Sequence, residues 1–269
     1  MTYAPIAPTI YVPPTEVAKD TFVIHQVQPA LGQPLFVYIN SMVIRGSEPV
    51  IVDTGTPANR TQWMEDAFAL VEPEDVRWVF LSHDDVDHSG NLDEVMTACP
   101  NATLVCSWAM VERHTNCFDF PLDRCRWVTD GESLDVGDRT LHAFRPPVFD
   151  SPTTRGLYDP TTKVYWAVDT FATPLPDPHM GVADLDGDFW RELMWVFALG
   201  AVSPWITMLD PVQNLDITTI AACHTPVIEG EFIEQAFARI RELPTLDAPQ
   251  LPDQSVLDQI VAATSQPPA

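Results

Sequence analysis

The sequence predicts an α/β fold in which two mixed β-sheets pack face to face and helices cover the outside. Short segments rich in Val and Ile alternate with turn residues, which is typical of buried strands. Helical patterns separate these strands in the first half of the chain, whereas the middle of the chain has strand-turn-strand patterns. A chain of 269 residues, 46% of them hydrophobic, is also long enough to form a large core.

The first half of the chain contains most of the expected strands. Strands are predicted where apolar runs end in turn residues or polar residues, at 22–27, 34–44, 49–55, 76–83 and 102–107. Helices are predicted where apolar residues recur every three or four positions, at 61–71, 91–100 and 107–117. Pro100 marks the end of the second helix because proline cannot continue one.

The second half of the chain begins with a predicted β-meander over residues 126–147. A strand is expected at 163–171, a short strand at 220–226 and an amphipathic helix at 229–243. Residues 184–222 are expected to be largely helical. The aromatic side chains in this region are expected to lie chiefly in the core, and they are Phe189, Trp190, Trp195, Phe197 and Trp205.

The expected domain organisation is simple. Residues 1–20 are rich in proline and are predicted to form an extended arm. Residues 21–243 contain no convincing linker and are expected to form one metal-binding domain. Residues 244–269 form a tail rich in Pro and Asp.

Charge and cysteine content restrict the partners and the compartment. A formal net charge of −24 repels nucleic acid and anionic membranes, so neither is expected as a partner. The five cysteines include no Cys-x-x-Cys pair, which indicates reduced thiols. The N-terminus lacks the basic region of a signal peptide, and no apolar run is long enough to span a membrane. We therefore expect a cytoplasmic protein.

The residues that can carry chemistry are densest in the segment His83-Asp84-Asp85-Val86-Asp87-His88, directly after a predicted strand. In an extended loop, alternation would point His83, Asp85 and Asp87 the same way. Such closely spaced carboxylates repel one another, and a bound metal cation would compensate them. The alternative is a solvated acidic loop with incidental histidines.

This His-x-Asp-x-Asp-His loop, with Asp53 and Gly55 in the upstream segment IVDTG, resembles the metallo-β-lactamase superfamily. Within it, residues 82–107 and 127–152 look like the oxygen-binding di-iron (ODP) domain of flavodiiron proteins. The 62 residues between Asp87 and Asp150 and the 18 between Asp150 and Asp169 are similar to that family's spacing. Asp-Thr-Gly also occurs in aspartic proteases, but these need a second copy for their carboxylate dyad.

The resemblance implies a metallo-β-lactamase-type αββα fold, with a site for two metal ions. Carried over by position, the first metal would be held by His83, Asp85 and Asp150, and the second by Asp87 and His224 with His88 beside it. Asp169 would bridge the two ions, and we expect Asp87 and His88 to be catalytic.

The chain departs from the family pattern at two of these positions. Asp85 stands where the ODP subgroup has Glu and the hydrolases have His, and Asp150 stands where both usually have His. A site rich in carboxylate favours iron, and zinc or manganese can also bind such a set. The alternatives are a turn-forming role for Asp150, a strand-end role for Asp169 and a core position for His224.

Two functions follow, and they differ in chemistry. The first is a di-iron protein that binds or reduces oxygen or a related small molecule. The chain is expected to hold no flavin site, so a separate flavin reductase would supply electrons, and a homodimer is implied by the resemblance. The second is a metal-dependent hydrolase of an ester, lactone, thioester or phosphoester, which uses a metal-bridging hydroxide. A non-catalytic, metal-stabilised interaction protein is a third possibility.

Overall fold

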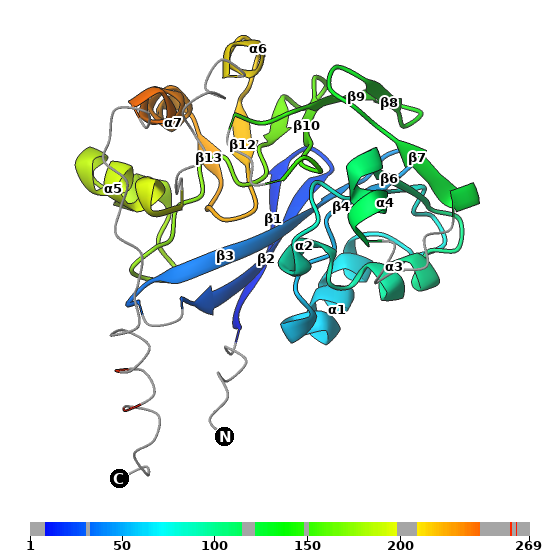
Figure 1. Cartoon of the computed structure of the whole chain (residues 1–269), viewed down its shortest axis with the longest axis horizontal. Helices are drawn as coiled ribbons and strands as arrows, with labels where there is room; N and C mark the ends of the chain where they lie inside the picture. Colours follow the sequence, from blue (N-terminus) through cyan, green and yellow to red (C-terminus); the bar gives the residue numbers. More distant parts are fainter. Residues whose placement is uncertain are drawn as a thin grey trace.

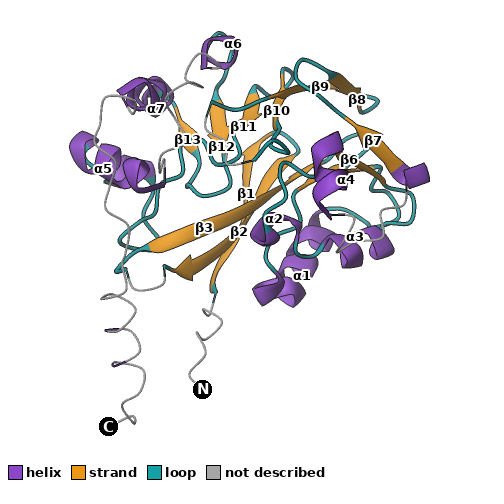
Figure 2. Ribbon diagram, in the orientation of Figure 1, coloured by secondary structure: helices purple, strands orange, loops and turns teal. Residues whose placement is uncertain are grey.

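The computed structural model describes residues 9–30, 33–114, 122–147, 151–197 and 209–242, together with the single positions 259 and 262. In this part of the chain two β-sheets stack face to face (Figure 1), and helices lie on the outer side of each sheet (Figure 2). The predicted α/β sandwich of two mixed sheets is therefore confirmed.

The first sheet has seven strands among the described residues, and their order in the sheet follows the sequence. The strands are β1 (Ile10–Ala18), β2 (Thr21–Pro29), β3 (Phe36–Ile44), β4 (Val50–Val52), β5 (Trp78–Phe80), β6 (Thr103–Cys106) and β7 (Cys125–Trp127). Strands β1 to β4 are antiparallel to their neighbours, and β4 to β7 are parallel.

The second sheet has six strands in the described part, in the order β13-β12-β11-β10-β9-β8. The strands are β8 (Ser133–Asp135), β9 (Thr140–Phe144), β10 (Gly156–Asp159), β11 (Val164–Trp166), β12 (Thr219–Ala221) and β13 (Ile228–Glu229). Only β11 and β12 pair in parallel among these described strands. Each sheet therefore contains parallel neighbours whose carboxyl ends share one edge.

The helices divide between the two sheets (Figure 1). Beside the first sheet lie α1 (Arg60–Leu70), α2 (Val86–Ser89), α3 (Leu92–Ala98) and α4 (Trp108–His114). Beside the second sheet lie α5 (Gly187–Phe197), α6 (Leu209–Gln213) and α7 (Glu231–Glu242). Short 3₁₀ turns occur at Pro57–Asn59, Leu122–Arg124 and Val182–Asp184.

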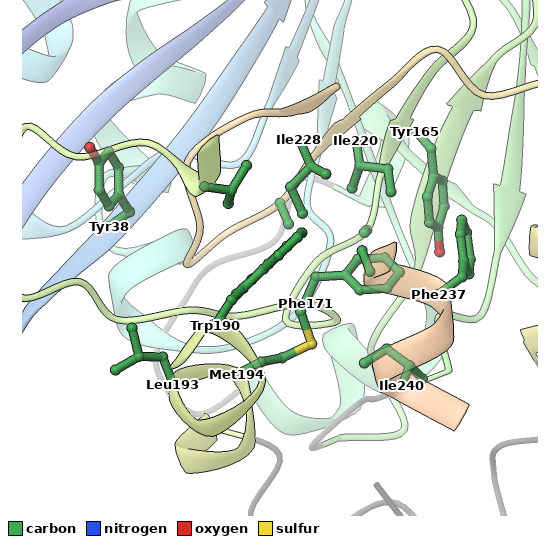
Figure 3. Close-up of a cluster of buried hydrophobic side chains, with 14 of the residues drawn as sticks. Tyr38, Tyr165, Phe171, Trp190, Leu193, Met194, Ile220, Ile228, Phe237 and Ile240 are labelled. Carbon is green, nitrogen blue, oxygen red and sulfur yellow. The ribbon is translucent and has the colours of Figure 1, made fainter. Parts of the chain in front are cut away.

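Three layers of buried apolar side chains hold this arrangement together. Between the sheets, Val52 and Phe80 of the first sheet belong to the same cluster as Trp166 of the second. An outer layer joins the first sheet to α1, α3 and α4. The other outer layer joins the second sheet to α5 and α7 (Figure 3), where Trp190 and Phe237 are almost fully buried. Burial on this scale is the main stabilising term of the fold.

Part of the aromatic-rich region lies in the core, as predicted. Trp190 is buried and its indole Nε1 donates a hydrogen bond to Thr173 Oγ1 at 3.2 Å, whereas Phe189 is partly exposed. The side chains of Trp195, Phe197 and Trp205 lie outside the described residues.

The Pro-rich segment is not a free arm where the structure describes it. Residues 10–18 form β1, the edge strand of the first sheet, paired with β2. Pro13 and Pro14 lie where the register shifts between Val12 and Thr15. Proline has no N–H to donate, so an edge strand with an interrupted ladder accommodates it.

The predicted meander over 126–147 is wrong in one respect. Strand β7 pairs with β6 in the first sheet, whereas β8 and β9 form a hairpin in the second sheet. The chain therefore crosses between the sheets after β7. Turn residues mark where strands end but not which sheet each strand joins. Strand β10 was not predicted at all.

Two further expectations can be checked on the described residues. Cys99, Cys106, Cys125 and Cys223 are all free thiols, and Cys117 lies outside the described part of the chain. Within that part, none of the helices combines the length and the hydropathy needed to cross a bilayer.

Candidate metal centre

The predicted site residues that the structure describes, together with Asp53, lie where four loops leave the carboxyl ends of strands β4, β5, β11 and β12. Asp53 N donates to Phe80 O at 2.8 Å, which continues the pairing of β4 and β5. Cys223 N donates to Val168 O at 2.8 Å, which continues the pairing of β11 and β12. Because both pairs are parallel, the loops that follow them begin at one edge of each sheet.

The loop after β5 is not extended, contrary to the prediction. Residues Val86–Ser89 form the short helix α2, with Asp85 in an extended conformation at its N-cap. Ser89 N and Ser89 Oγ both donate to Asp85 O, at 2.8 and 2.9 Å. This turn brings His88 into the interior, where it is fully buried, while the side chain of Asp85 stays half-exposed.

His83 is oriented by its neighbour Ser82 and by Asp53. Ser82 Oγ donates its single proton to Asp53 Oδ2 at 2.7 Å. Ser82 Oγ therefore acts as the acceptor in its 2.9 Å contact with His83 Nδ1. His83 Nε2 lies 3.7 Å from Asp169 Oδ2 and 4.0 Å from Asp85 Oδ2, and it carries the lone pair when the ring is neutral with its proton on Nδ1. A histidine held in this way is ready to bind a metal through Nε2.

His224 is oriented by the backbone of β3. Its Nδ1 donates to Tyr38 O at 2.7 Å, which leaves Nε2 directed at the other site residues. Nε2 of His224 lies 3.2 Å from His88 Nε2, 3.4 Å from Asp169 Oδ1 and 3.8 Å from Asp87 Oδ2. Asp87 Oδ2 is also 3.4 Å from His88 Nε2.

Asp169 lies between His83 on one side and His224 on the other. Its backbone is strained. Val168 and Phe171, on either side of it, have φ angles of +55° and +71°. Positive φ is unfavourable for a β-branched or bulky side chain, so the surrounding structure must enforce it. Both carboxylate oxygens of Asp169 are inaccessible to solvent, yet neither has a hydrogen-bond partner among the described residues.

The electrostatics of the site couple its carboxylates to its histidines. Burial raises the pKa of Asp169, but the fields of His83 and His224 outweigh burial and hold the pKa well below its usual range. The pKa of Asp87 is held low in the same way, against burial, chiefly by His88. Burial lowers the pKa of His224, but Asp169 and Asp87 raise it to about 9. Without a metal ion, a proton on His224 partly compensates these carboxylates.

Asp53 contacts Ser82 and His88, two residues of the candidate site and its support. It is fully buried, and its two oxygens accept from Ser82 N and Ser82 Oγ, each at 2.7 Å. Its Oδ2 also lies 3.9 Å from His88 Nδ1. Asp53 adopts φ of +61°, and Gly55, two residues on, adopts +69°, where a Cβ atom would lie 2.4 Å from Gln26 Oε1. The Asp-Thr-Gly segment therefore helps to position the loop His83–His88, which is called the metal loop below.

Asp84 anchors the metal loop to the segment that follows Asp150. Its Oδ1 accepts from Ser151 Oγ at 2.8 Å and from Thr153 Oγ1 at 2.7 Å, and its Oδ2 lies 2.6 Å from Arg113 Nε. Burial raises the pKa of Asp84, but these hydroxyls and Arg113 hold it below its usual range. Asp150 itself lies outside the described residues.

Asn40 of β3 holds the segment that carries His224. Its Nδ2 donates to Ala222 O at 2.9 Å and to Thr225 O at 2.8 Å, and its backbone N donates to Cys223 O at 2.9 Å. Its Oδ1 accepts from His25 Nδ1 at 2.9 Å. The supporting roles of Asn40, Ser82 and Tyr38 were not predicted. A single polar side chain such as Asn40 or Ser82 has no distinctive spacing, and Tyr38 acts through its backbone oxygen.

The described residues form three groups that suit a metal ion, and in each the ligand atoms lie within 4.8 Å of one another. One group is Asp87, His88 and His224. The other two share Cys223, which lies with His83 and Asp169 in one and with Asp53 and His88 in the other. A buried carboxylate without hydrogen bonds, flanked by imidazole nitrogens, fits a cation better than it fits any neutral partner.

Comparison with known proteins agrees with this geometry. The family described as "ODP family beta lactamase" matches residues 37–225. The chain belongs to this ODP family. Its fold is that of flavodiiron cores, as its similarity to the flavodiiron protein from Giardia intestinalis shows. That similarity has a TM-score of 0.75 at 18% identity and covers 87% of this chain and 60% of the other.

Relatives with similar sequences carry flavoprotein names. Diflavin flavoprotein A 1 from Synechocystis sp. is 26% identical over 205 residues, which is 73% of this chain and 35% of the relative. The anaerobic nitric oxide reductase flavorubredoxin of Pectobacterium atrosepticum is 24% identical over 192 residues, 69% of this chain and 38% of the relative. This ODP-family chain thus spans little more than a third of the length of these two relatives.

Proposed function

We propose that this chain binds two divalent metal ions, with iron favoured, and reduces oxygen or a related small molecule with electrons from an external flavin donor. The observation that carries the proposal is Asp169. Its two buried oxygens face imidazole nitrogens on both sides, His83 Nε2 at 3.7 Å and His224 Nε2 at 3.4 Å. A carboxylate in this position can serve two metal ions at once.

The proposed ligands fall into two sets that share Asp169. His83 and Asp85, with Asp150, would hold the first ion, and Asp87 and His224 would hold the second, with His88 beside it. Two bound iron ions would supply the oxygen-binding and electron-transfer chemistry. The carboxylate-rich donor set and the ODP family membership both favour iron over the zinc of the hydrolases.

The chain's own residues would orient these ligands and supply protons. Ser82 Oγ and Tyr38 O fix the ring orientations of His83 and His224, so that both Nε2 atoms face inward. His88 and Asp87 are the expected catalytic pair. Their facing atoms, His88 Nε2 and Asp87 Oδ2, lie 3.4 Å apart, so His88 beside the second ion would hold a proton on Nε2 next to the Asp87 carboxylate and could pass it to a reduced product.

The external donor would approach over the metal loop. Val86, between Asp85 and Asp87, is 68% exposed, so the loop that carries the ligands reaches the protein surface. The names of the relatives indicate a flavin as the electron source. A second copy of the chain or a separate reductase can present it there.

Metal analysis combined with oxygen uptake tests the proposal. The protein is purified without added zinc, its metals are quantified, and oxygen consumption is measured with reduced flavin as donor. We expect close to two iron ions per chain and oxygen uptake well above the flavin blank. Asp169→Asn is the inactive reference, and exposed Asp123→Asn is the matched control that should behave as wild type.

Zinc as the sole bound metal, with no oxygen or nitric oxide consumption and with hydrolysis of a chromogenic ester or lactone, would contradict the proposal in favour of a hydrolase. Metal-loaded protein without any turnover of these substrates would also contradict it, and would favour an interaction protein.

A further inference from the structure

Cys223, the residue before His224, has its thiol at the metal centre. The side chain is fully buried, and Sγ lies within 4.8 Å of a ring nitrogen of His83 and a carboxylate oxygen of Asp169. Sulfur is a normal ligand for zinc, cobalt and iron when it lies among imidazole and carboxylate donors. The predicted ligand set did not include this residue.

The position of this thiol is fixed by the backbone around it. Cys223 N donates to Val168 O at 2.8 Å, and Cys223 O accepts from Asn40 N at 2.9 Å. The side-chain amide of Asn40 also binds Ala222 O and Thr225 O on either side. Strand β3 therefore holds Cys223 and His224 as one rigid pair, and both side chains belong to candidate metal groups.

Two sets of partners lie near Sγ, and their hydrogen bonding distinguishes them. On one side, the Cys223 thiol donates a hydrogen bond to Asp53 Oδ2 at 3.8 Å, and the same carboxylate oxygen also accepts from Ser82 Oγ at 2.7 Å. On the other side, the buried oxygens of Asp169 have only imidazole nitrogens as polar neighbours, His83 Nε2 at 3.7 Å and His224 Nε2 at 3.4 Å. A carboxylate, an imidazole and a thiol gathered in this way suit a cation shared by Asp169, His83 and Cys223.

We propose that Cys223 is a sulfur ligand of the metal ion held by His83 and Asp169. On binding, the S–H bond breaks, the proton leaves to solvent, and the sulfur lone pair forms the bond to the metal. The first metal position would then combine nitrogen, oxygen and sulfur donors, while the second, at Asp87, His88 and His224, would have only nitrogen and oxygen. This inference rests on the proposed dinuclear site and assigns a softer donor set to one half of it.

Cobalt spectroscopy tests the assignment without measuring activity. Cobalt(II) bound at any site gives visible ligand-field bands, whereas a cobalt–thiolate bond adds an intense charge-transfer band in the near ultraviolet. We expect both in the wild type. Cys223→Ser should keep the ligand-field bands and lose the charge-transfer band, with cobalt affinity at least about tenfold lower. Cys106→Ser, which removes another fully buried thiol, is the matched control and should keep both.

Ligand-field bands without a charge-transfer band in the wild type would overturn the sulfur ligand and leave the dinuclear site intact. A charge-transfer band that persists in Cys223→Ser would overturn it as well. Absence of all cobalt bands in the wild type would instead refute the metal site itself. If the variant does not fold, X-ray absorption can be measured on the metal-loaded wild type instead. A sulfur scatterer at about 2.3 Å from the metal is expected. Absence of this scatterer would refute the proposal.

Discussion

The candidate metal centre has two halves that are built in different ways. The half on the first sheet is one continuous segment, His83 to Ser89, whose turn is closed by its own hydrogen bonds to Asp85 O. The half on the second sheet consists of Asp169 and His224, which are separated by 54 residues. Distant residues position it, since Tyr38 and Asn40 of the first sheet hold the segment around His224.

The side chains of the first half are therefore positioned by residues close to them in sequence, and those of the second half by residues far from them in sequence. In the first half, a short helix after a strand is enough to gather several donors. In the second half, backbone strain on both sides of Asp169 and a hydrogen-bonded contact between the two sheets are required. The second half should therefore be more sensitive to changes in residues far from it in sequence.

The largest effect is expected from Asp169, the residue of the second half that would serve both metal ions. Asp169→Asn should weaken the binding of both ions by more than about 100-fold, since loss of an outer-shell partner alone costs 10- to 100-fold. Asp85→Asn should remove at most one ion, because its side chain is half-exposed and lies 4.0 Å from His83 Nε2. Metal per chain is measured after equal loading and gel filtration. Equal losses in the two variants would refute the bridging role of Asp169.

A smaller effect is expected from the contact that holds the second half in place. Asn40→Ala leaves Ala222 O and Thr225 O without their donor, so the free energy of unfolding should fall by about 1–3 kcal/mol. Metal affinity should fall about tenfold as His224 loses its support. Urea unfolding and metal titration measure the two quantities.

Ser41→Ala is the matched control for Asn40→Ala. Ser41 is the next residue on β3, is equally buried, and accepts a hydrogen bond from Trp63 Nε1 at 3.0 Å. Loss of the Ser41 hydroxyl should lower the free energy of unfolding by a similar amount and leave the metal affinity unchanged. Parallel losses of affinity in both variants would show that Asn40 acts through general stability alone.

The smallest effect concerns His25, which lies behind Asn40. Burial lowers the pKa of His25 below 6.5, and its hydrogen bond to Asn40 only partly opposes this. The folded state therefore keeps His25 neutral while the unfolded chain takes up a proton, so stability is complete above about pH 6.5 and falls as the pH decreases. The loss approaches about 1.4 kcal/mol per pH unit at most.

Comparison with His25→Gln isolates this contribution, since glutamine does not titrate. Urea unfolding at pH ~5 and pH ~7 should show a larger stability difference in the wild type than in the variant. The same pH dependence in both proteins would exclude His25 as its source.

Strands and helices with strong local patterns were predicted correctly. The segments at 22–27 and 34–44 form β2 and β3, and the segment at 61–71 contains most of α1. Errors arose where pairing partners decide the structure. Residues 10–18 became an edge strand, β7 joined the first sheet, and the short β10 was missed. Local sequence carries little information about which strand will pair with which.

The candidate site shows the same division. The spacing of His83, Asp85, Asp87 and His88 marked the metal loop, and the family resemblance added Asp169 and His224. Asp85 is the weakest member of the described set, because α2 begins directly after it and leaves its side chain half-exposed. The ligand role of Asp150 stays a prediction, supported by the anchoring of Ser151 to Asp84 beside the metal loop.

The class of fold, the metal loop and the carboxylate-rich composition of the site could be predicted from sequence, because they depend on local periodicity and on residues close together in the chain. Which side-chain atoms face one another in the candidate site depends instead on contacts between segments that are distant in sequence. Ser82 and Tyr38 orient two imidazoles, the strained loop presents both oxygens of Asp169, and Asn40 fixes Cys223 beside them. These contacts join segments up to 186 residues apart, and hydrogen bonds of that range exist only after the two sheets have packed together.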